Sequence, residues 1–400
     1  MHAALNQAMQ RVRLSPIVSI SEDVRRLAPT FQKETGKQFV LFQRGEIDYP
    51  TPTYIVEALQ VALAEGRTHY PKSGGEDVLK DAIVTKLRDW NGVEGIGRDH
   101  VVVTCGGQEA LELAFMLFRG QRGAGFAPLW SCVLENFIPF TDVAFTEVPL
   151  AADFSLDLPA LEGAVKQSAF FYLNTPHNPT GKVFTEDEVR TVVDLCRHYG
   201  VYVVADEAYE RILYDRASHF SPTSLPDAHI IGAFTFSKTF AMTGWRIGYL
   251  VCRDASLAKL IRLGDYSQTA GIATFIQYAA AEALTNRAAA EDALADMREE
   301  FQRRRNALAD GLSMLPGIDV TRPQGGFYFF PNFSRLIPSG LGTEARSRFI
   351  FEKLMRHGVA TVYGSCFGVH FPENIRFSIS FAPLPMIAEG LERMAVALRS

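Results

Sequence analysis

The 400-residue sequence has few of the features that mark secreted or membrane proteins. Its five cysteines are scattered and form no CxxC pair, which argues against a disulfide framework and against a zinc site. No stretch approaches the roughly 18 uncharged apolar residues of a membrane span. The first residues contain no apolar run typical of a signal peptide. We therefore expect a cytoplasmic protein with no membrane partner and no bound metal.

The sequence also lacks an excess of positive charge. It has 40 lysines and arginines against 45 acidic residues, a net charge of −5 at pH 7. Nucleic-acid-binding domains are usually basic, so we expect no nucleic acid partner. The densest basic run, Arg303, Arg304 and Arg305, lies in an acid-rich helical region and is interpreted as a solvated helix face.

Apolar strands alternate with amphipathic helices through the middle of the chain, between about residues 101 and 252. Continuous apolar strands separated by helices indicate a mostly parallel sheet that is covered by helices on both faces. The strand-like segments are HVVVT, DVAFTEVPL, AFFYLN, VYVVADEAY, HIIGAFTFS and RIGYLVC.

The flanking regions follow other patterns. We expect residues 1–48 to be irregular, with one helix near SEDVRRLAPTF. Two amphipathic helices follow, the first with Thr53 as a plausible N-cap and the second ended by Asn91 and Gly92. Two long helices run from about Gln277 to Leu315, and the remainder alternates short strands with helices, as in an α+β domain.

Polar residues gather where the apolar strands end. In a parallel sheet, ligands bind at the carboxyl ends of the strands. We therefore predict a single crevice built from four strand ends, namely residues 104–107, 174–181, 206–209 and 237–238.

Three segments of this crevice have residues that could bind a ligand. Asp206 follows four apolar residues, so it is either a structural ion-pair partner or a carboxylate that keeps a ligand's ring nitrogen protonated. Asn178 is fixed in the stiff turn NTPHNPTG, which is an ordinary turn or a ligand-holding one. The glycine pair in TCGGQEAL offers backbone N–H groups to a phosphate, although it is not a GxGxxG motif.

The segment FSKTFAMTGWRIGYL adds a lysine and an arginine to surroundings that we expect to be largely buried. Ser237 and Arg246 suit a phosphate group. A Schiff base between Lys238 and an aldehyde would remove the cost of a buried ammonium group. Pyridoxal 5'-phosphate has the aldehyde, the phosphate and the ring nitrogen that these segments together require.

Over nearly its whole length, the chain resembles the class I/II aminotransferases of the fold-type I pyridoxal-phosphate family, the aspartate aminotransferase superfamily. Eight segments carry the resemblance in the expected order: FQRGEIDYPTP, HYPKSGGEDVLKDAI, TCGGQEAL, NTPHNPTGKVF, VVADEAYE, FSKTFAMTGWRIGY, PQGGFYFF and IRFSIS. The resemblance implies an α/β fold with a seven-stranded, mostly parallel sheet in a large domain, residues 49–294. It implies a smaller α+β domain built from an N-terminal arm, residues 1–48, and the C-terminal part, residues 295–400.

The resemblance also implies roles for individual residues. Lys238 is the Schiff-base lysine and proton shuttle, and Asp206 keeps the ring nitrogen protonated. Tyr209 and Asn178 hydrogen-bond the ring 3′ oxygen, and Trp130 stacks on the ring face. Lys238, Asp206 and Tyr209 are thus the predicted catalytic residues.

The phosphate and the substrate have their own implied partners. Gly107, Gln108, Ser237 and Arg246 would bind the phosphate, joined by Tyr70 from the neighbouring subunit of a homodimer. For the substrate, the implied residues that bind its α-carboxylate and amino-acid portion are Arg376, Gly45 and Asn178.

Two features of the sequence bear on substrate choice. The family's PGxxFG segment reads YGSCFG here, so Tyr363 and Cys366 either alter side-chain selectivity or reflect drift in a loop. We find no confident second cation for a distal carboxylate, so aspartate is not a favoured substrate.

The sequence predicts an aminotransferase that moves an amino group between an L-amino acid and a 2-oxo acid. Two alternatives stay open. The same cofactor would also serve a C–S β-lyase, a synthase or a decarboxylase that acts on an amino acid. A regulatory protein that only senses the cofactor would need a DNA-binding module, and no helix-turn-helix is evident.

Overall fold

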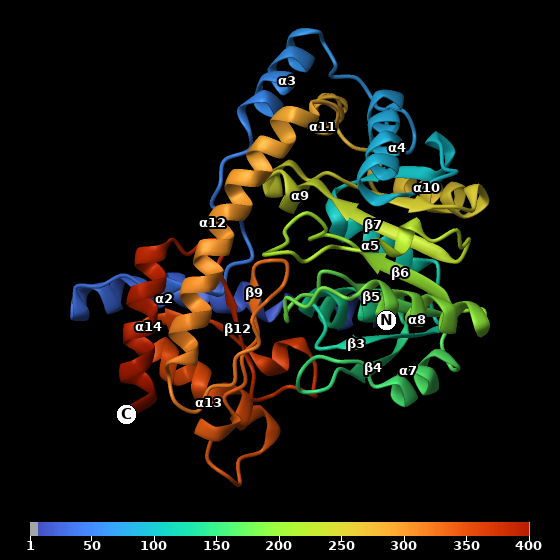
Figure 1. Ribbon diagram of the computed structural model, residues 1–400. Coiled ribbons are helices and arrows are strands. Elements are labelled where there is room, and N and C mark those ends of the chain that lie inside the picture. The colour runs from blue at the N-terminus through green and yellow to red at the C-terminus, as the bar shows by residue number, and fades with distance from the viewer. Residues whose placement is uncertain (1–6, 400) are drawn as a thin grey trace, which may run out of the picture.

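The apolar segments form the central sheet of the computed structural model, which describes residues 7–399 (Figure 1). Its seven strands lie in the order β2-β8-β7-β6-β5-β3-β4. Only β8 runs antiparallel to its neighbours among these strands, so the predicted mostly parallel, seven-stranded α/β fold is confirmed. The strands are β2 Val101–Thr104, β3 Arg122–Ala127, β4 Ala144–Pro149, β5 Phe170–Asn174, β6 Tyr202–Asp206, β7 Ile230–Thr235 and β8 Gly248–Cys252.

Helices cover both faces of this sheet because its strands are apolar on both sides. Along β5, Phe170 and Tyr172 pack into the core beneath α5, while Phe171 and Leu173 pack into the core that α8 covers. The helices that cover the sheet are α4 Asp77–Asn91, α5 Gly106–Met116, α7 Leu158–Val165, α8 Glu186–His198, α10 Ala255–Thr269 and α11 Thr274–Thr285.

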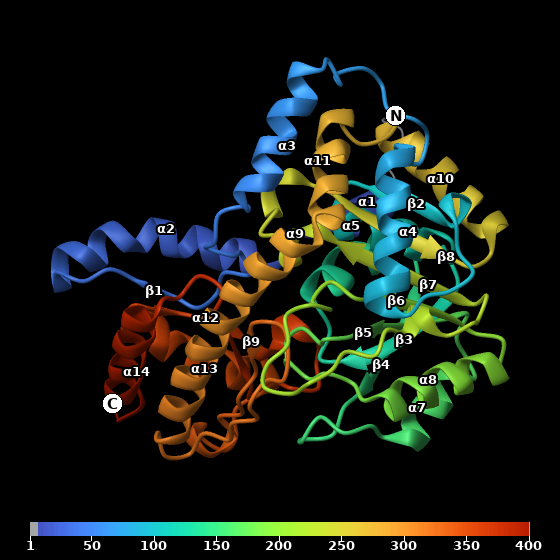
Figure 2. The same ribbon diagram turned by 45° about the horizontal axis from the view of Figure 1, so that its top comes forward.

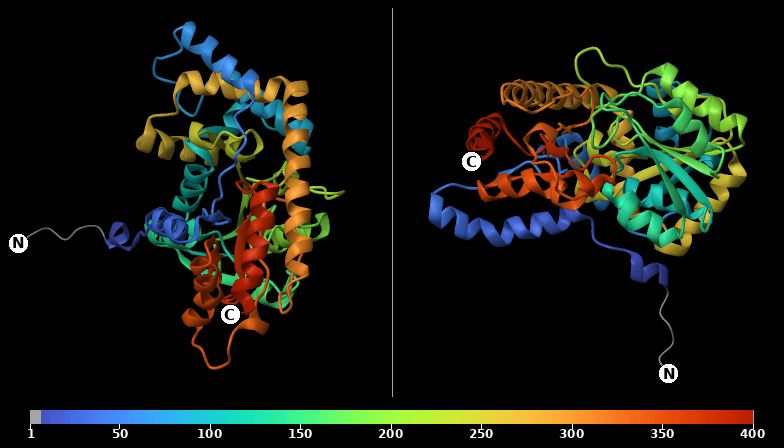
Figure 3. Two further views of the ribbon diagram at one scale, coloured as in Figure 1. Left: turned by 90° about the vertical axis from the view of Figure 1, so that its left-hand side faces the viewer. Right: turned by 90° about the horizontal axis from the view of Figure 1, so that it is seen from below.

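Parts of the N-terminal and C-terminal regions meet beside the sheet. Helices α2 and α14 lie on the same side of the molecule in two views (Figures 1 and 2), and β1 pairs with β10. Figure 3 shows that α2 and α14 lie apart from the large sheet. The elements of this region are α2 Pro16–Thr35, β1 Val40–Leu41, β9 Tyr328–Phe329, α13 Thr343–Arg356, β10 Val359–Ala360, β11 Val362–Tyr363, β12 Ile375–Ser378 and α14 Leu384–Arg399, whereas α1 Gln7–Arg11 packs against α6, Ile138–Thr141, of the sheet region.

One helix connects the two regions. Helix α12, Arg287–Ser313, runs without a break past residue 294, where the sequence suggested a domain boundary. Helix α3, Thr53–Ala64, packs against α11, and short helices α6, Ile138–Thr141, and α9, Phe236–Thr239, complete the fold. Among residues 7–399, no helix combines the length and apolar character needed to cross a membrane.

Several local predictions differ from the structure. Thr53 is the first residue of α3, and Pro52 occupies the N-cap position. Helix α2 is longer than expected, because Ser15 caps its first turn and the helix continues through Pro29. Helix α10 was not predicted; its N-cap is Asp254, whose side chain accepts a hydrogen bond from the Ser256 backbone N–H at 2.8 Å. Residues 1–6 of the predicted N-terminal arm lie outside the described residues.

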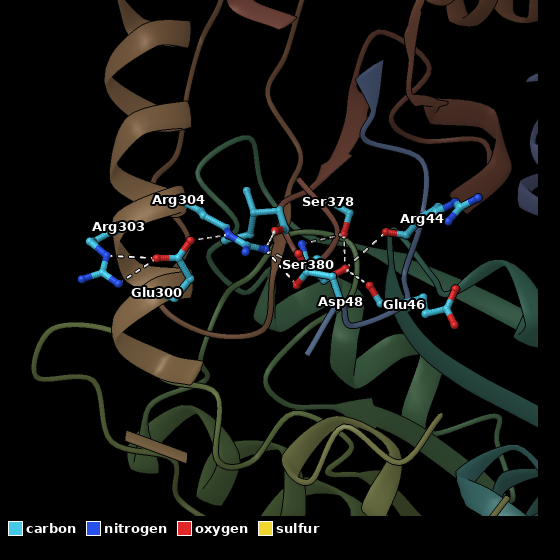
Figure 4. Close-up of polar contacts among 9 residues, drawn as sticks. Arg44, Glu46, Asp48, Glu300, Arg303, Arg304, Ser378 and Ser380 are labelled. Atoms are coloured by element: carbon cyan, nitrogen blue, oxygen red, sulfur yellow. Dashed lines mark hydrogen bonds and ion pairs between the residues drawn. The ribbon is translucent and has the colours of Figure 1, made fainter. Parts of the chain in front are cut away.

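The interpretation of the arginine run as a solvated face is wrong for two of its three residues. Arg303 is exposed, but Arg304 and Arg305 are only 5% and 2% exposed. Arg304 pairs with Asp48 at 3.0 Å and also donates to a backbone carbonyl near the end of β12 (Figure 4). Because these partners come from distant segments, the local sequence gave no sign that these arginines are buried.

Candidate active site

A cavity of about 670 Å³ opens at the carboxyl edge of the sheet. Segments from four strand ends line it, as the crevice prediction required, and α2 contributes residues to its mouth. Every predicted site residue except Tyr70 lines this cavity: Gly45, Gly107, Gln108, Trp130, Asn178, Asp206, Tyr209, Ser237, Lys238, Arg246 and Arg376.

Lys238 lies in the short helix α9, which directly follows β7. Its Nζ donates a hydrogen bond to the backbone carbonyl of Gly45 at 3.0 Å. Burial, together with the positive charges of Arg246 and Arg376, lowers the pKa of Lys238 to about 8. The fraction of Lys238 that is unprotonated near neutral pH is therefore much larger than for an exposed lysine.

Asp206 ends β6 and is 5% exposed. Its Oδ2 accepts a hydrogen bond from the Tyr172 hydroxyl at 2.7 Å, and its Oδ1 accepts one from the Ala208 backbone N–H at 3.2 Å. Burial raises the pKa of Asp206 to about 6, although these two hydrogen bonds oppose the rise. The carboxyl group remains mainly ionised at neutral pH.

An asparagine pair connects Asp206 to the next strand. Asn174 Nδ2 donates to the backbone carbonyl of Asp206 at 3.0 Å, and Asn174 Oδ1 accepts from the Asn178 backbone N–H at 2.7 Å. The Asn178 side chain lines the cavity, and its buried Oδ1 has no hydrogen-bond partner among the described residues. The Tyr209 hydroxyl lies 3.5 Å from the Tyr328 hydroxyl.

The end of the cavity beside α5 is suited to an anion. The first turn of this 11-residue helix contains Gly107 and Gln108, and its N-terminus faces Ser237 and Arg246 across the cavity. Gly106 has φ +81°, and a Cβ there would lie 2.9 Å from Arg246 Nη2. A larger residue would therefore displace the guanidinium group.

The prediction that the Lys238–Arg246 segment is buried is wrong for Arg246. This residue is exposed at the cavity rim. Its guanidinium is held in place by hydrogen bonds to the backbone carbonyls of Thr243 at 2.9 Å and Cys105 at 3.4 Å. The guanidinium is thus exposed to solvent but fixed by two backbone carbonyls.

Arg376 lies on β12 at the opposite side of the cavity and is buried. Its Nη2 donates to the Gln43 carbonyl at 3.0 Å, and its guanidinium stacks 4.4 Å from the Tyr328 ring centre. Within residues 7–399, its buried Nε has no hydrogen-bond partner. A Cβ at Gly45 would collide with the Tyr328 hydroxyl, which explains the glycine at that position.

Three residues singled out from the sequence lie elsewhere or have other neighbours. Tyr70 is 94% exposed and lies at a second surface cavity, beside Pro71 and Phe275. Tyr363 and Cys366 are buried and do not line the main cavity. The Tyr363 hydroxyl accepts a hydrogen bond from Arg348 at 3.0 Å.

Sequence reasoning missed several residues in or beside the cavity. Tyr172 does not line the cavity, but its hydroxyl contacts Asp206, which does, and nothing in the local sequence indicated this contact. Tyr328 was part of a recognised segment without a role. Arg25 and Arg44 also line the cavity and provide cations that the sequence did not reveal.

The fold and the cavity define an α/β enzyme whose site lies at the carboxyl edge of a mostly parallel sheet. The family model "Aminotransferase class I and II" matches residues 37–394, and the chain belongs to this family. It is therefore an aminotransferase, which transfers an amino group between an amino acid and an oxo acid.

Named relatives agree with this assignment. The chain is 35% identical over 406 residues to a probable aspartate/prephenate aminotransferase of Aquifex aeolicus, covering 100% of this chain and 99% of the relative. It is 31% identical over 363 residues to aromatic-amino-acid aminotransferase 2 of Thermococcus litoralis, covering 89% and 90% of the two chains. A solved structure of Thermus thermophilus aspartate aminotransferase with maleate superposes with a TM-score of 0.89 at 30% identity, covering 99% of this chain and 100% of that chain. The lyase and regulator alternatives are not favoured.

Proposed function

We propose that the protein is a pyridoxal-phosphate-dependent aminotransferase in which Lys238 binds the cofactor covalently. One observation carries the proposal: a lysine amine, a buried carboxylate and an anion-binding helix end face the same cavity of about 670 Å³. These are the three groups that an aldehyde, a ring nitrogen and a phosphate require.

The residues present are chemically suited to this cofactor. Asn178 Oδ1 is buried without a partner among the described residues, so a ligand that donates or shares a proton there would satisfy it. The phosphate would be held at the N-terminus of α5, where glycines allow close approach and Arg246 supplies a cation. The residues that would hold the remaining parts are Lys238 for the aldehyde, Asp206 for the ring nitrogen, Asn178 and Tyr209 for the ring oxygen, and Trp130 for the ring face.

When bound, this cofactor supplies an electron sink for the carbanion that forms when the substrate Cα loses its proton. The chain supplies the rest. Asp206, kept ionised, holds the proton on the ring nitrogen. Lys238 Nζ, whose pKa of about 8 leaves a usable fraction of free amine, would remove the proton from the substrate Cα and carry it to the acceptor carbon.

The substrate's α-carboxylate would bind Arg376, which is buried, fixed by Gln43 and left with an unpaired Nε within residues 7–399. For a second carboxylate, Arg25 and Arg44 provide cations at the mouth of the cavity. The names of the relatives, aspartate/prephenate and aromatic aminotransferases, support dicarboxylic or aromatic amino acids as substrates. This proposal replaces the expectation from sequence that aspartate is disfavoured.

A homodimer would complete the site. Tyr70 is exposed and does not line the main cavity of its own chain. Helix α10 also exposes the apolar residues Leu260, Leu263 and Tyr266. Such a patch favours association with another copy of the chain, which would bring Tyr70 to the partner's phosphate site.

Borohydride reduction tests the covalent assignment. The protein is loaded with pyridoxal phosphate, reduced and digested, and the peptides are analysed by mass spectrometry. We expect the cofactor mass on Lys238, and we expect Lys238→Ala to lose both this adduct and transamination. Lys182→Ala removes a lysine outside the cavity and should keep both. An adduct that persists at its normal level in Lys238→Ala would refute the assignment.

Single-turnover analysis separates transamination from lyase chemistry. Mixing the loaded protein with an amino acid should convert the bound cofactor to its amine form and release one equivalent of 2-oxo acid. Release of pyruvate and ammonia with the aldehyde form regenerated would instead indicate a lyase.

A further inference from the structure

The carboxylate of Asp206 receives a hydrogen bond from a side chain to which neither the sequence motifs nor the comparisons assign a role. Tyr172 on β5 donates its hydroxyl to Asp206 Oδ2 at 2.7 Å. We propose that Tyr172 is a positioning residue whose hydroxyl fixes the orientation of the Asp206 carboxylate and stabilises its ionised form. The inference rests on the proposed function, in which Asp206 keeps a ring nitrogen protonated.

The strand register explains how Tyr172 reaches Asp206. Asn174 is paired with Asp206 across the β5–β6 ladder, and Tyr172 lies two residues earlier on the same face of β5. Its side chain therefore points along that face towards the end of β6. The long phenol ring spans the distance that a shorter side chain at this position would leave open.

Packing holds the phenol ring in one place. Tyr172 is 2% exposed and belongs to the apolar core beneath α5. Its ring meets that of Phe115 edge to face at 5.9 Å between centroids. Its hydroxyl lies in this apolar setting, where the Asp206 carboxylate provides the acceptor that a buried hydroxyl requires. The hydroxyl and the carboxylate are thus each held by the other.

Charged and titratable groups face the pair from several elements. Lys238 and the Ala208 N–H favour the ionised carboxylate, and the Glu207 charge opposes it. Glu207 itself is turned away from the cavity, towards Thr223 and His219. The other titratable groups near the Tyr172 hydroxyl are Tyr209 and Cys132.

The effect of the hydroxyl on Asp206 has a chemical consequence. Burial already brings the pKa of Asp206 to about 6, close to the range in which a carboxyl group begins to hold its proton at neutral pH. Without the Tyr172 hydrogen bond the carboxylate would be less stable and the pKa would rise further. A protonated Asp206 would leave the ring nitrogen without its ionic partner, and the electron sink would weaken.

The variant Tyr172→Phe removes the hydroxyl and keeps the ring. In the protein free of cofactor, carbon-13 NMR of labelled aspartate carboxyl groups, with Asp206→Asn for assignment, reports the pKa of Asp206. We expect a rise of about 1–2 pKa units, the size expected for one lost hydrogen bond to a charged group. An unchanged pKa of Asp206 would overturn the proposal.

The matched control is Tyr214→Phe. Tyr214 is also fully buried and donates its hydroxyl to the Gly326 carbonyl, but it does not contact Asp206. Loss of a buried hydroxyl should lower the stability of both variants, whereas only Tyr172→Phe should shift the pKa of Asp206. A shift of the same size in both variants would show a general structural effect and would contradict the proposal.

Kinetics of the loaded enzyme test the role in the reaction. In Tyr172→Phe we expect kcat to fall about tenfold or more with little change in KM, and the acidic limb of the kcat profile to move to higher pH. An unmoved profile beside a shifted pKa would refute the functional role. Failure of the wild-type protein to bind pyridoxal phosphate would instead refute the proposed function, while the titration would still report the hydrogen bond.

Discussion

At the scale of single residues, burial shifts the two central titratable groups of the cavity towards neutrality. The pKa of Lys238 falls to about 8 and that of Asp206 rises to about 6, in both cases mainly because a charged group loses its water. Such perturbed groups facing one cavity are typical of catalytic sites. The same effect makes nearby fixed cations important, since Arg246 and Arg376 lower the pKa of the lysine further.

Substitutions of Arg376 and Arg44, which both line the cavity, should affect the binding of different substrate carboxylates. Arg376→Gln should raise KM for amino acids about 100-fold or more, because a charge-assisted pair with the α-carboxylate is lost, and should change the rate with a simple amine much less. The measurement is steady-state kinetics with an amino acid and with its decarboxylated amine. An equal loss for both substrates would place the carboxylate site elsewhere.

Arg44→Gln is the companion variant. Arg44 lines the cavity mouth with its guanidinium 4.4 Å from the Phe381 ring centre. We expect it to weaken kcat/KM for dicarboxylic amino acids about tenfold, with little change for apolar ones, because only the former have a second carboxylate. Unchanged selectivity between aspartate and phenylalanine would remove Arg44 from the substrate site.

At the scale of elements, α12 holds the segment that carries Gly45 into the cavity. Arg304 on α12 donates to Asp48 at 3.0 Å and Glu300 at 2.8 Å (Figure 4). The Ser380 hydroxyl donates to the Glu46 carbonyl at 2.6 Å on the other side of the same segment. An ion pair between a buried arginine and a partly exposed aspartate thus ties a long helix to an irregular stretch of the active site.

We expect Arg304→Ala to lower the free energy of unfolding by about 1–3 kcal/mol, because the Ile379 carbonyl loses its buried donor and two partly exposed carboxylates lose their counter-charge. Arg303→Ala, one residue away on the exposed face, should change it by less than about 1 kcal/mol. Equilibrium denaturation of both variants makes the comparison. Similar values for the two arginines would contradict the role assigned to Arg304.

At the scale of the whole molecule, the cavity of one chain lacks one of the residues that were predicted to bind the phosphate. Tyr70 is 94% exposed and does not line it. If a second copy supplies Tyr70, the variants Tyr70→Ala and Lys238→Ala should complement each other. In a hybrid dimer, one site receives the intact lysine and the partner's intact tyrosine, and we expect about half of the wild-type activity per dimer.

The measurement uses hybrid dimers purified with two different affinity tags. Each parent homodimer is the control, with little or no activity expected from Lys238→Ala and weakened cofactor binding from Tyr70→Ala. Hybrids no more active than a mixture of the two parents would show that Tyr70 does not act across subunits.

The comparison of sequence with structure shows where local patterns suffice. The strand ends at Asp206 and Asn174 were predictable, because continuous apolar strands impose a parallel sheet and a parallel sheet places its carboxyl ends together. The capping of α8 at Thr185 was equally local, since both partners of its capping box lie within four residues. Domain boundaries and individual catalytic roles stay predictions.

The sequence by itself determined the family, the sheet and the set of polar residues at its carboxyl edge, because these depend on periodicity and on short motifs. Only the tertiary structure decided that Arg304 and Arg305 are buried, that Arg25 and Arg44 reach the cavity, and that Tyr172 binds Asp206. Each of these depends on contacts between segments far apart in the chain. A side chain's partner across such a distance is fixed by packing, and no local pattern specifies it.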